Sequence, residues 1–60
     1  DEAILDYTKV LSVEASNADA YYNRGVALHL KGAQNPCSDW EQALKLGHKG
    51  AADMMNQYCK

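Results

Sequence analysis

Residues 18–32, with the sequence ADAYYNRGVALHLKG, carry the apolar pattern around which the rest of this 60-residue chain can be organised. Tyr21, Gly25 and Leu28 recur at intervals of three and four, the spacing of one face of an α-helix. A glycine closes the stretch, as glycine commonly does at the end of a helix. The pattern predicts a helix over residues 18–31 that packs against neighbours on both sides.

Gly25 lies inside this expected helix, where glycine costs about 1 kcal/mol relative to alanine. Such a cost indicates that another helix backbone approaches closely at this position. The alternative is a glycine that the helix tolerates without any packing role.

The segment before this helix predicts a helix of its own. Residues 1–15 place apolar side chains at three-and-four spacing, and Leu5 falls off that face. Leu5 is expected either to be exposed or to contact an element upstream. Ser16 and Asn17 interrupt the pattern, and either side chain can cap the following helix.

Two more helices are expected after it. Asn35 and the proline that follows make a favourable start for a helix over residues 36–46, because asparagine caps and proline suits the first helical position. Gly47 is expected to end this helix. Gly50 is expected to open a short last helix over residues 51–59.

Composition and charge exclude several classes of protein. A hydrophobic fraction of 47% and a charged fraction of 23% are those of a globular chain. The net charge of −2 and scattered lysines leave no basic stripe for nucleic acid, and no apolar run approaches the roughly 18 residues of a membrane span. No hydrolase, zinc-protease or phosphate-loop motif is present. The start at Asp1 without a methionine indicates a fragment.

The chain also repeats itself. A shift of 33 positions superimposes both kinds of expected helix. The coinciding residues are Asp6 and Asp39, Tyr7 and Trp40, Leu11 and Leu44, Ala18 and Ala51, and Asn23 and Asn56.

These motifs resemble the tetratricopeptide repeat over nearly the whole chain. Its W-x-x-L-G-x-x-Y spacing is matched by Tyr21, Arg24, Gly25 and Leu28, and its A-x-x-x-F spacing by Ala3 with Tyr7 and by Pro36 with Trp40. Arg24 stands where the family has a leucine. The segments CSDWEQALKLG and YC are similar to terminal repeats of bacterial multi-repeat proteins.

The resemblance implies an all-α fold in which four helices form antiparallel pairs stacked as a superhelical array. It divides this single domain, residues 1–60, into three parts. Residues 1–16 would be the second helix of a preceding repeat, residues 17–47 one complete repeat, and residues 48–60 a C-terminal capping helix.

The resemblance further implies that the first helix of each repeat lines a concave ligand surface. In this chain that stripe would consist of Asp19, Tyr22, Asn23, Val26, His29 and Leu30. Its mixture of rings, apolar groups and polar groups suits an extended peptide or a partner helix. The function predicted is non-catalytic binding of an unidentified protein or peptide, without a cofactor. Two alternatives are a neighbouring helix that covers the stripe and a purely structural cap that ends a longer array.

Cys37 and Cys59 form a second candidate site. They lie near the start and the end of two expected antiparallel helices, so they should be close neighbours. A disulfide between them would staple the last helix and indicate an extracytoplasmic, periplasmic location; two reduced thiols would fit the cytoplasm. A reactive thiol or a metal module remains an alternative, although these cysteines with His29 and His48 match no compact zinc-finger spacing.

Overall fold

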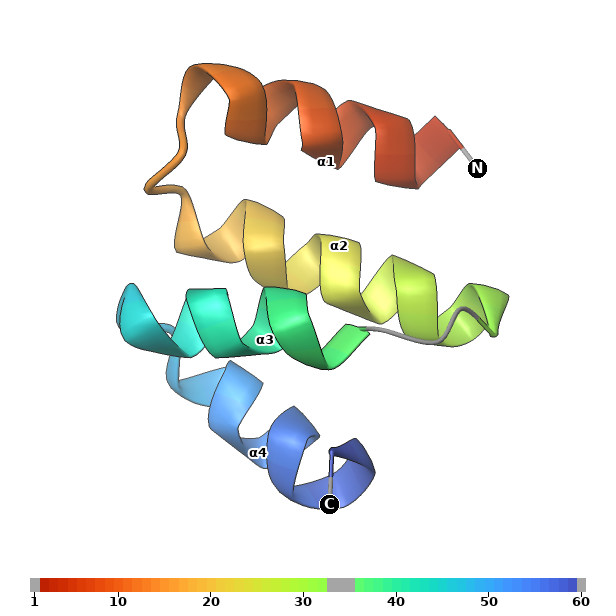
Figure 1. The fold of residues 1–60 in the computed structure, drawn as a ribbon, viewed down its shortest axis with the longest axis vertical. Helices are drawn as coiled ribbons and strands as arrows, with labels where there is room; N and C mark the ends of the chain where they lie inside the picture. Colours follow the sequence, from red (N-terminus) through yellow and green to blue (C-terminus); the bar gives the residue numbers. More distant parts are fainter. Residues whose placement is uncertain (1, 33–35, 60) are drawn as a thin grey trace.

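The chain is a stack of four helices in the computed structural model, which describes residues 2–32 and 36–59 (Figure 1). The helices are α1 (Glu2–Val13), α2 (Ala18–Lys31), α3 (Pro36–Lys45) and α4 (Lys49–Tyr58). Each helix runs antiparallel to the one before it and packs beside it, from α1 at one end of the stack to α4 at the other. The predicted all-α fold with stacked antiparallel helix pairs is confirmed.

Two caps define α2 as the sequence indicates. Of the two candidate cap residues, Asn17 is the one used: its side-chain oxygen accepts a hydrogen bond of 3.0 Å from the backbone N–H of Ala20. At the other end Gly32 adopts φ of 83°, a left-handed conformation that glycine reaches without a steric penalty.

The expected limits of three helices need correction. α1 ends at Val13 rather than at residue 15, because the chain turns before Asn17. α3 ends at Lys45, one residue early, ahead of Gly47 with its φ of 99°. Asn35 and Asp1, which the sequence also singles out, lie outside the described residues.

The largest correction concerns the start of α4. The helix begins at Lys49, two residues before the predicted start, and Gly50 lies within its first turn rather than before it. The cause is His48, whose extended backbone (φ −84°, ψ 101°) already occupies the position before the helix. α4 also ends one residue early, at Tyr58, so that Cys59 lies just beyond the helix.

The core lies between α2, α3 and α4. Trp40, Ala43 and Ala51 are fully buried, and half-buried side chains from α2, α3 and α4 pack against them. α1 contributes Leu11, which is 8% exposed, whereas Leu5 is exposed. No helix in the described part of the chain is long and apolar enough to cross a membrane.

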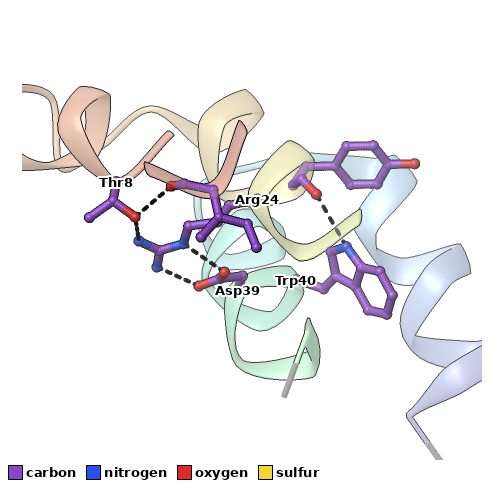
Figure 2. Close-up of polar contacts among 6 residues, drawn as sticks. Thr8, Arg24, Asp39 and Trp40 are labelled. Carbon is purple, nitrogen blue, oxygen red and sulfur yellow. Dashed lines mark hydrogen bonds and ion pairs between the residues drawn. The ribbon is translucent and has the colours of Figure 1, made fainter. Parts of the chain in front are cut away.

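The Trp40 ring packs directly against α2 at Gly25. A Cβ atom at Gly25 would lie 2.5 Å from Trp40 Nε1 and 2.6 Å from Cδ1. The same indole nitrogen donates a hydrogen bond of 3.3 Å to the backbone carbonyl of Tyr22 (Figure 2). The close approach expected at Gly25 is therefore made by an indole ring rather than by a helix backbone.

Replacing Gly25 with alanine should destabilise the fold by about 1 to 2 kcal/mol, because overpacking against Trp40 outweighs the better helix propensity of alanine. Urea unfolding followed by circular dichroism measures this change. Asn23→Ala, at an exposed position of the same helix, is the matched control and should leave stability within about 0.5 kcal/mol. A Gly25→Ala variant as stable as the parent would contradict the close contact.

Candidate protein-interaction surface

The six side chains of the predicted binding stripe all lie on α2, but they differ in exposure. Asp19, Asn23 and Leu30 are exposed, and 79% of Leu30 is open to solvent. Tyr22, Val26 and His29 are half-buried. The structure thus divides the stripe into three exposed and three half-buried side chains.

Tyr22 and Asp19 both contact His48 at the start of α4. The Tyr22 and His48 rings stack with their centroids 4.2 Å apart and their planes 11° apart. His48 Nε2 lies 3.4 Å from the Asp19 carboxylate, while Nδ1 is buried without a hydrogen-bond partner among the residues described. One end of the stripe is therefore held against α4 by a stacked ring pair.

His29 makes the second group of ring contacts. Its ring centroid lies 4.3 Å from that of Tyr58 in α4 and 5.9 Å from that of Trp40 in α3. Val26 packs against the buried core. Tyr22, Val26 and His29 consequently help to hold α3 and α4. The exposed side chains of the stripe are Asn23, Leu30 and Asp19, the last of which also contacts His48.

Arg24 projects from another side of α2 and joins three helices. Its Nε and Nη2 atoms donate to the two carboxylate oxygens of Asp39 in α3 at 2.7 and 2.6 Å, and Nη1 lies 3.4 Å from the Thr8 hydroxyl in α1 (Figure 2). The side chains of Arg24 and Asp39 are 22% and 8% exposed. The hydrogen bonds to Asp39, and then its negative charge, raise the pKa of Arg24 against the opposing effect of burial.

Sequence reasoning missed this ion pair. Arg24 stands where the family has a leucine and is assigned no partner from the sequence, and Asp39 appears there only as the repeat equivalent of Asp6. The sequence did contain a signal for this pair. The helical pattern places Arg24 on a buried side of its helix, and a buried charge requires a carboxylate on the facing helix. The pair also lines a hollow of about 300 Å³ between α1, α2 and α3, together with Ile4, Thr8, Leu28 and Ser38.

Cys37 and Cys59 are joined by a disulfide in the structure, with their Cα atoms 5.9 Å apart. Cys37 lies in the first turn of α3 and Cys59 directly follows α4, so the bond ties the end of the last helix back to the start of the preceding one. In the described part of the chain neither cysteine is free, and no three His, Cys, Asp or Glu side chains are grouped to hold a metal ion.

Breaking the Arg24–Asp39 pair from one side should be costly. Asp39→Asn leaves the guanidinium without its charge partner and should lower stability by about 2 kcal/mol, less than for a fully buried pair because Arg24 is partly exposed. Replacing both residues with leucine should restore most of that loss. Glu41→Gln, which breaks the exposed pair with Lys45, is the matched control and should cost less than about 0.5 kcal/mol. Equal costs for the two single substitutions would contradict the difference in burial.

Replacing Cys37 and Cys59 with serine should lower stability by about 3 kcal/mol in the chain-entropy model, since the bond closes a loop between residues 22 positions apart. Urea unfolding with and without a thiol reductant measures this loss. The reductant should destabilise the parent and leave the double variant unchanged. Labelling of both cysteines by an alkylating agent in unreduced protein would show instead that the thiols are free.

The first half of the chain is similar to a known repeat family. The family model for the TPR repeat matches residues 1–32, which is more than half of the 60-residue chain. Neither the curated proteins nor the solved structures contain a significant match. The matched residues span α1 and α2, including the Arg24–Gly25 pair against which α3 packs. The chain belongs to the tetratricopeptide repeat family.

Proposed function

We propose that this chain is a non-catalytic protein-interaction module that binds an extended peptide or a partner helix along the exposed side of α2. Tetratricopeptide repeats act in general as protein-interaction scaffolds, and the family is generally non-catalytic. The observation that carries the proposal is the exposure of Asp19, Asn23 and Leu30 on one helix beside the half-buried rings of Tyr22 and His29.

The chemistry of this surface supports peptide binding. Leu30 is 79% exposed and offers apolar area, while the Asn23 amide can both donate to and accept from a peptide backbone. The contacts of Tyr22 and His29 with α4 limit the motion of their rings before any ligand arrives. A surface ordered in advance loses less entropy on binding.

The reactive side chains support a non-catalytic role, because those best suited to chemistry already have structural partners. Asp39 accepts two hydrogen bonds from Arg24, and Cys37 and Cys59 are bonded to each other. A disulfide persists in oxidising compartments, so the intact bond favours an extracytoplasmic location.

A second role, as the cap that ends a repeat array, is favoured by Tyr58. The 33-residue repeat places Tyr58 at the position that Gly25 occupies in α2. Gly25 accepts the indole of Trp40, whereas a tyrosine at the equivalent position leaves no room for a large ring from a following helix. The disulfide at Cys59 also holds this end of α4 against α3. We therefore propose that α4 closes the stack.

Peptides selected from a random display library on the immobilised protein should bind through the exposed residues of α2. Asn23→Ala and Leu30→Asp should each weaken binding about tenfold or more, measured by calorimetry with a synthetic peptide, because both residues contact the ligand directly. Tyr22 and His29 are poor test positions because their rings also hold α4.

Lys9→Ala, at an exposed position of α1, is the matched control and should leave the affinity unchanged. Peptides that bind the Asn23 and Leu30 variants as well as they bind the parent would contradict the proposed surface. The capping role would then stand alone.

A further inference from the structure

α4 has few means of its own to stay in place. It has ten residues, a length at which an isolated helix is marginal in water. His48 at its start makes no side-chain capping hydrogen bond, and Ala51 is the one buried residue among the positions described in this helix. The attachment of α4 to the stack therefore depends on contacts outside the helix.

Two covalent connections join α4 to α3, one at each end. Residues 46–48 connect the two helices, and Gly47 among them has a φ of 99°, a backbone conformation that favours glycine. The disulfide between Cys37 and Cys59 ties the far end of α4 to the start of α3. Without the disulfide α4 is joined only through residues 46–48, where a glycine can absorb the rotation of a hinge.

α4 covers aromatic rings that belong to the proposed binding surface or lie beneath it. The Tyr58 ring centroid lies 4.3 Å from that of His29 and 6.1 Å from that of Trp40, and His48 stacks on Tyr22. Trp40 is fully buried, whereas Tyr22 and His29 are half-buried. Moving α4 away would add the covered faces of these rings to the surface that α2 offers to a ligand.

We propose that the Cys37–Cys59 bond is a redox latch on the peptide-binding surface of α2. While the bond is intact, α4 covers the rings. When the bond is reduced, α4 turns away, and an aromatic side chain of the peptide takes the place of Tyr58 against His29 and Trp40. An aromatic residue suits this place because tilted ring pairs attract each other beyond the area that they bury. The inference rests on the proposed peptide-binding function and adds its regulation.

Opening the latch takes two electrons and two protons from a dithiol. Both cysteines are half-buried rather than buried, so a small dithiol can reach the bond. Its thiolate attacks the Cys59 sulfur, forms a mixed disulfide there and expels Cys37 as a thiolate, whose negative charge the start of α3 stabilises. The second thiolate of the donor then displaces Cys59. The two cysteine thiolates each take up a proton, and the donor is left as a cyclic disulfide.

Trp40 reports the position of α4, because it is the one tryptophan of the chain. Dithiothreitol should shift its fluorescence emission to longer wavelength, as expected for a ring that becomes exposed to water. Circular dichroism should show that most of the helical signal is retained, since α1, α2 and α3 stay folded. The Cys37→Ser/Cys59→Ser variant is the matched control, and its emission should lie at the longer wavelength with and without the reductant.

Peptide affinity then tests the regulation. A synthetic peptide with an aromatic residue, selected from a display library on the reduced protein, should bind that form about tenfold or more tightly than the oxidised form. Changing the aromatic residue of the peptide to alanine should remove this difference. Asn23→Ala should weaken binding in both redox states, because Asn23 is exposed even while α4 is in place.

Three results would overturn the inference: unchanged Trp40 emission in protein whose full reduction is verified by alkylation and mass spectrometry, loss of the whole helical signal on reduction, or equal peptide affinity in the two redox states. Dimerisation that appears only on reduction would assign the uncovered rings to a second copy and overturn it as well.

The failure of this inference can be told apart from the failure of the proposed function. Exposure of Trp40 on reduction without peptide binding in either state would confirm the latch and defeat the peptide-binding function alone. Peptide binding through Asn23 and Leu30 that does not depend on the redox state would defeat the latch alone.

Discussion

The fold depends on the contact between the Trp40 indole and the α2 backbone at Gly25. A side chain at residue 25 would collide with the ring, so glycine sets how closely α2 and α3 approach. That approach also places the preceding residue of each helix face to face, and Arg24 meets Asp39 in a two-point ion pair. Trp40 is the one large side chain among the described residues that is fully buried. The Trp40–Gly25 contact and the Arg24–Asp39 ion pair therefore specify the same alignment of α2 and α3. A shift of one helix along the other would break both, which favours a single arrangement.

α4 shows how a chain of this size can hold a short terminal helix. A domain of about 60 residues buries a smaller share of its surface than a larger one, so its core alone gives limited stability. Here the start of α4 is held by the Tyr22–His48 stack, and its far end by the Tyr58 ring contacts and the disulfide at Cys59. The ring contacts come from the same residues that line the predicted binding stripe. The proposed binding stripe and the docking of the last helix therefore share the side chains of Tyr22 and His29.

Because Tyr22 and His29 also hold the last helix, fewer side chains of the proposed stripe are free to contact a ligand. Tyr22 and His29 are half-buried because their rings contact His48 and Tyr58, and the exposed positions of the stripe are Asp19, Asn23 and Leu30. At the other end of the stack, Asp6 of α1 is exposed, whereas its repeat equivalent in α3, Asp39, is buried. The two ends of the stack therefore differ: the end of α4 is held by ring contacts and a disulfide, and α1 carries no such tie in the described part of the chain.

The sequence by itself determined the four helices, their order and their repeat, because apolar spacing, asparagine caps and glycine stops act within a few residues of one another. The same helical pattern indicated that a neighbouring helix comes close to Gly25 and that Cys37 and Cys59 are neighbours. Tertiary structure decided that Arg24 pairs with Asp39, that His48 starts α4 early, and that Tyr22 and His29 contact α4. These choices join residues distant in sequence and depend on side-chain direction and on the distance between helices. Periodicity along one helix can show which side is buried, but not which partner atom it will meet.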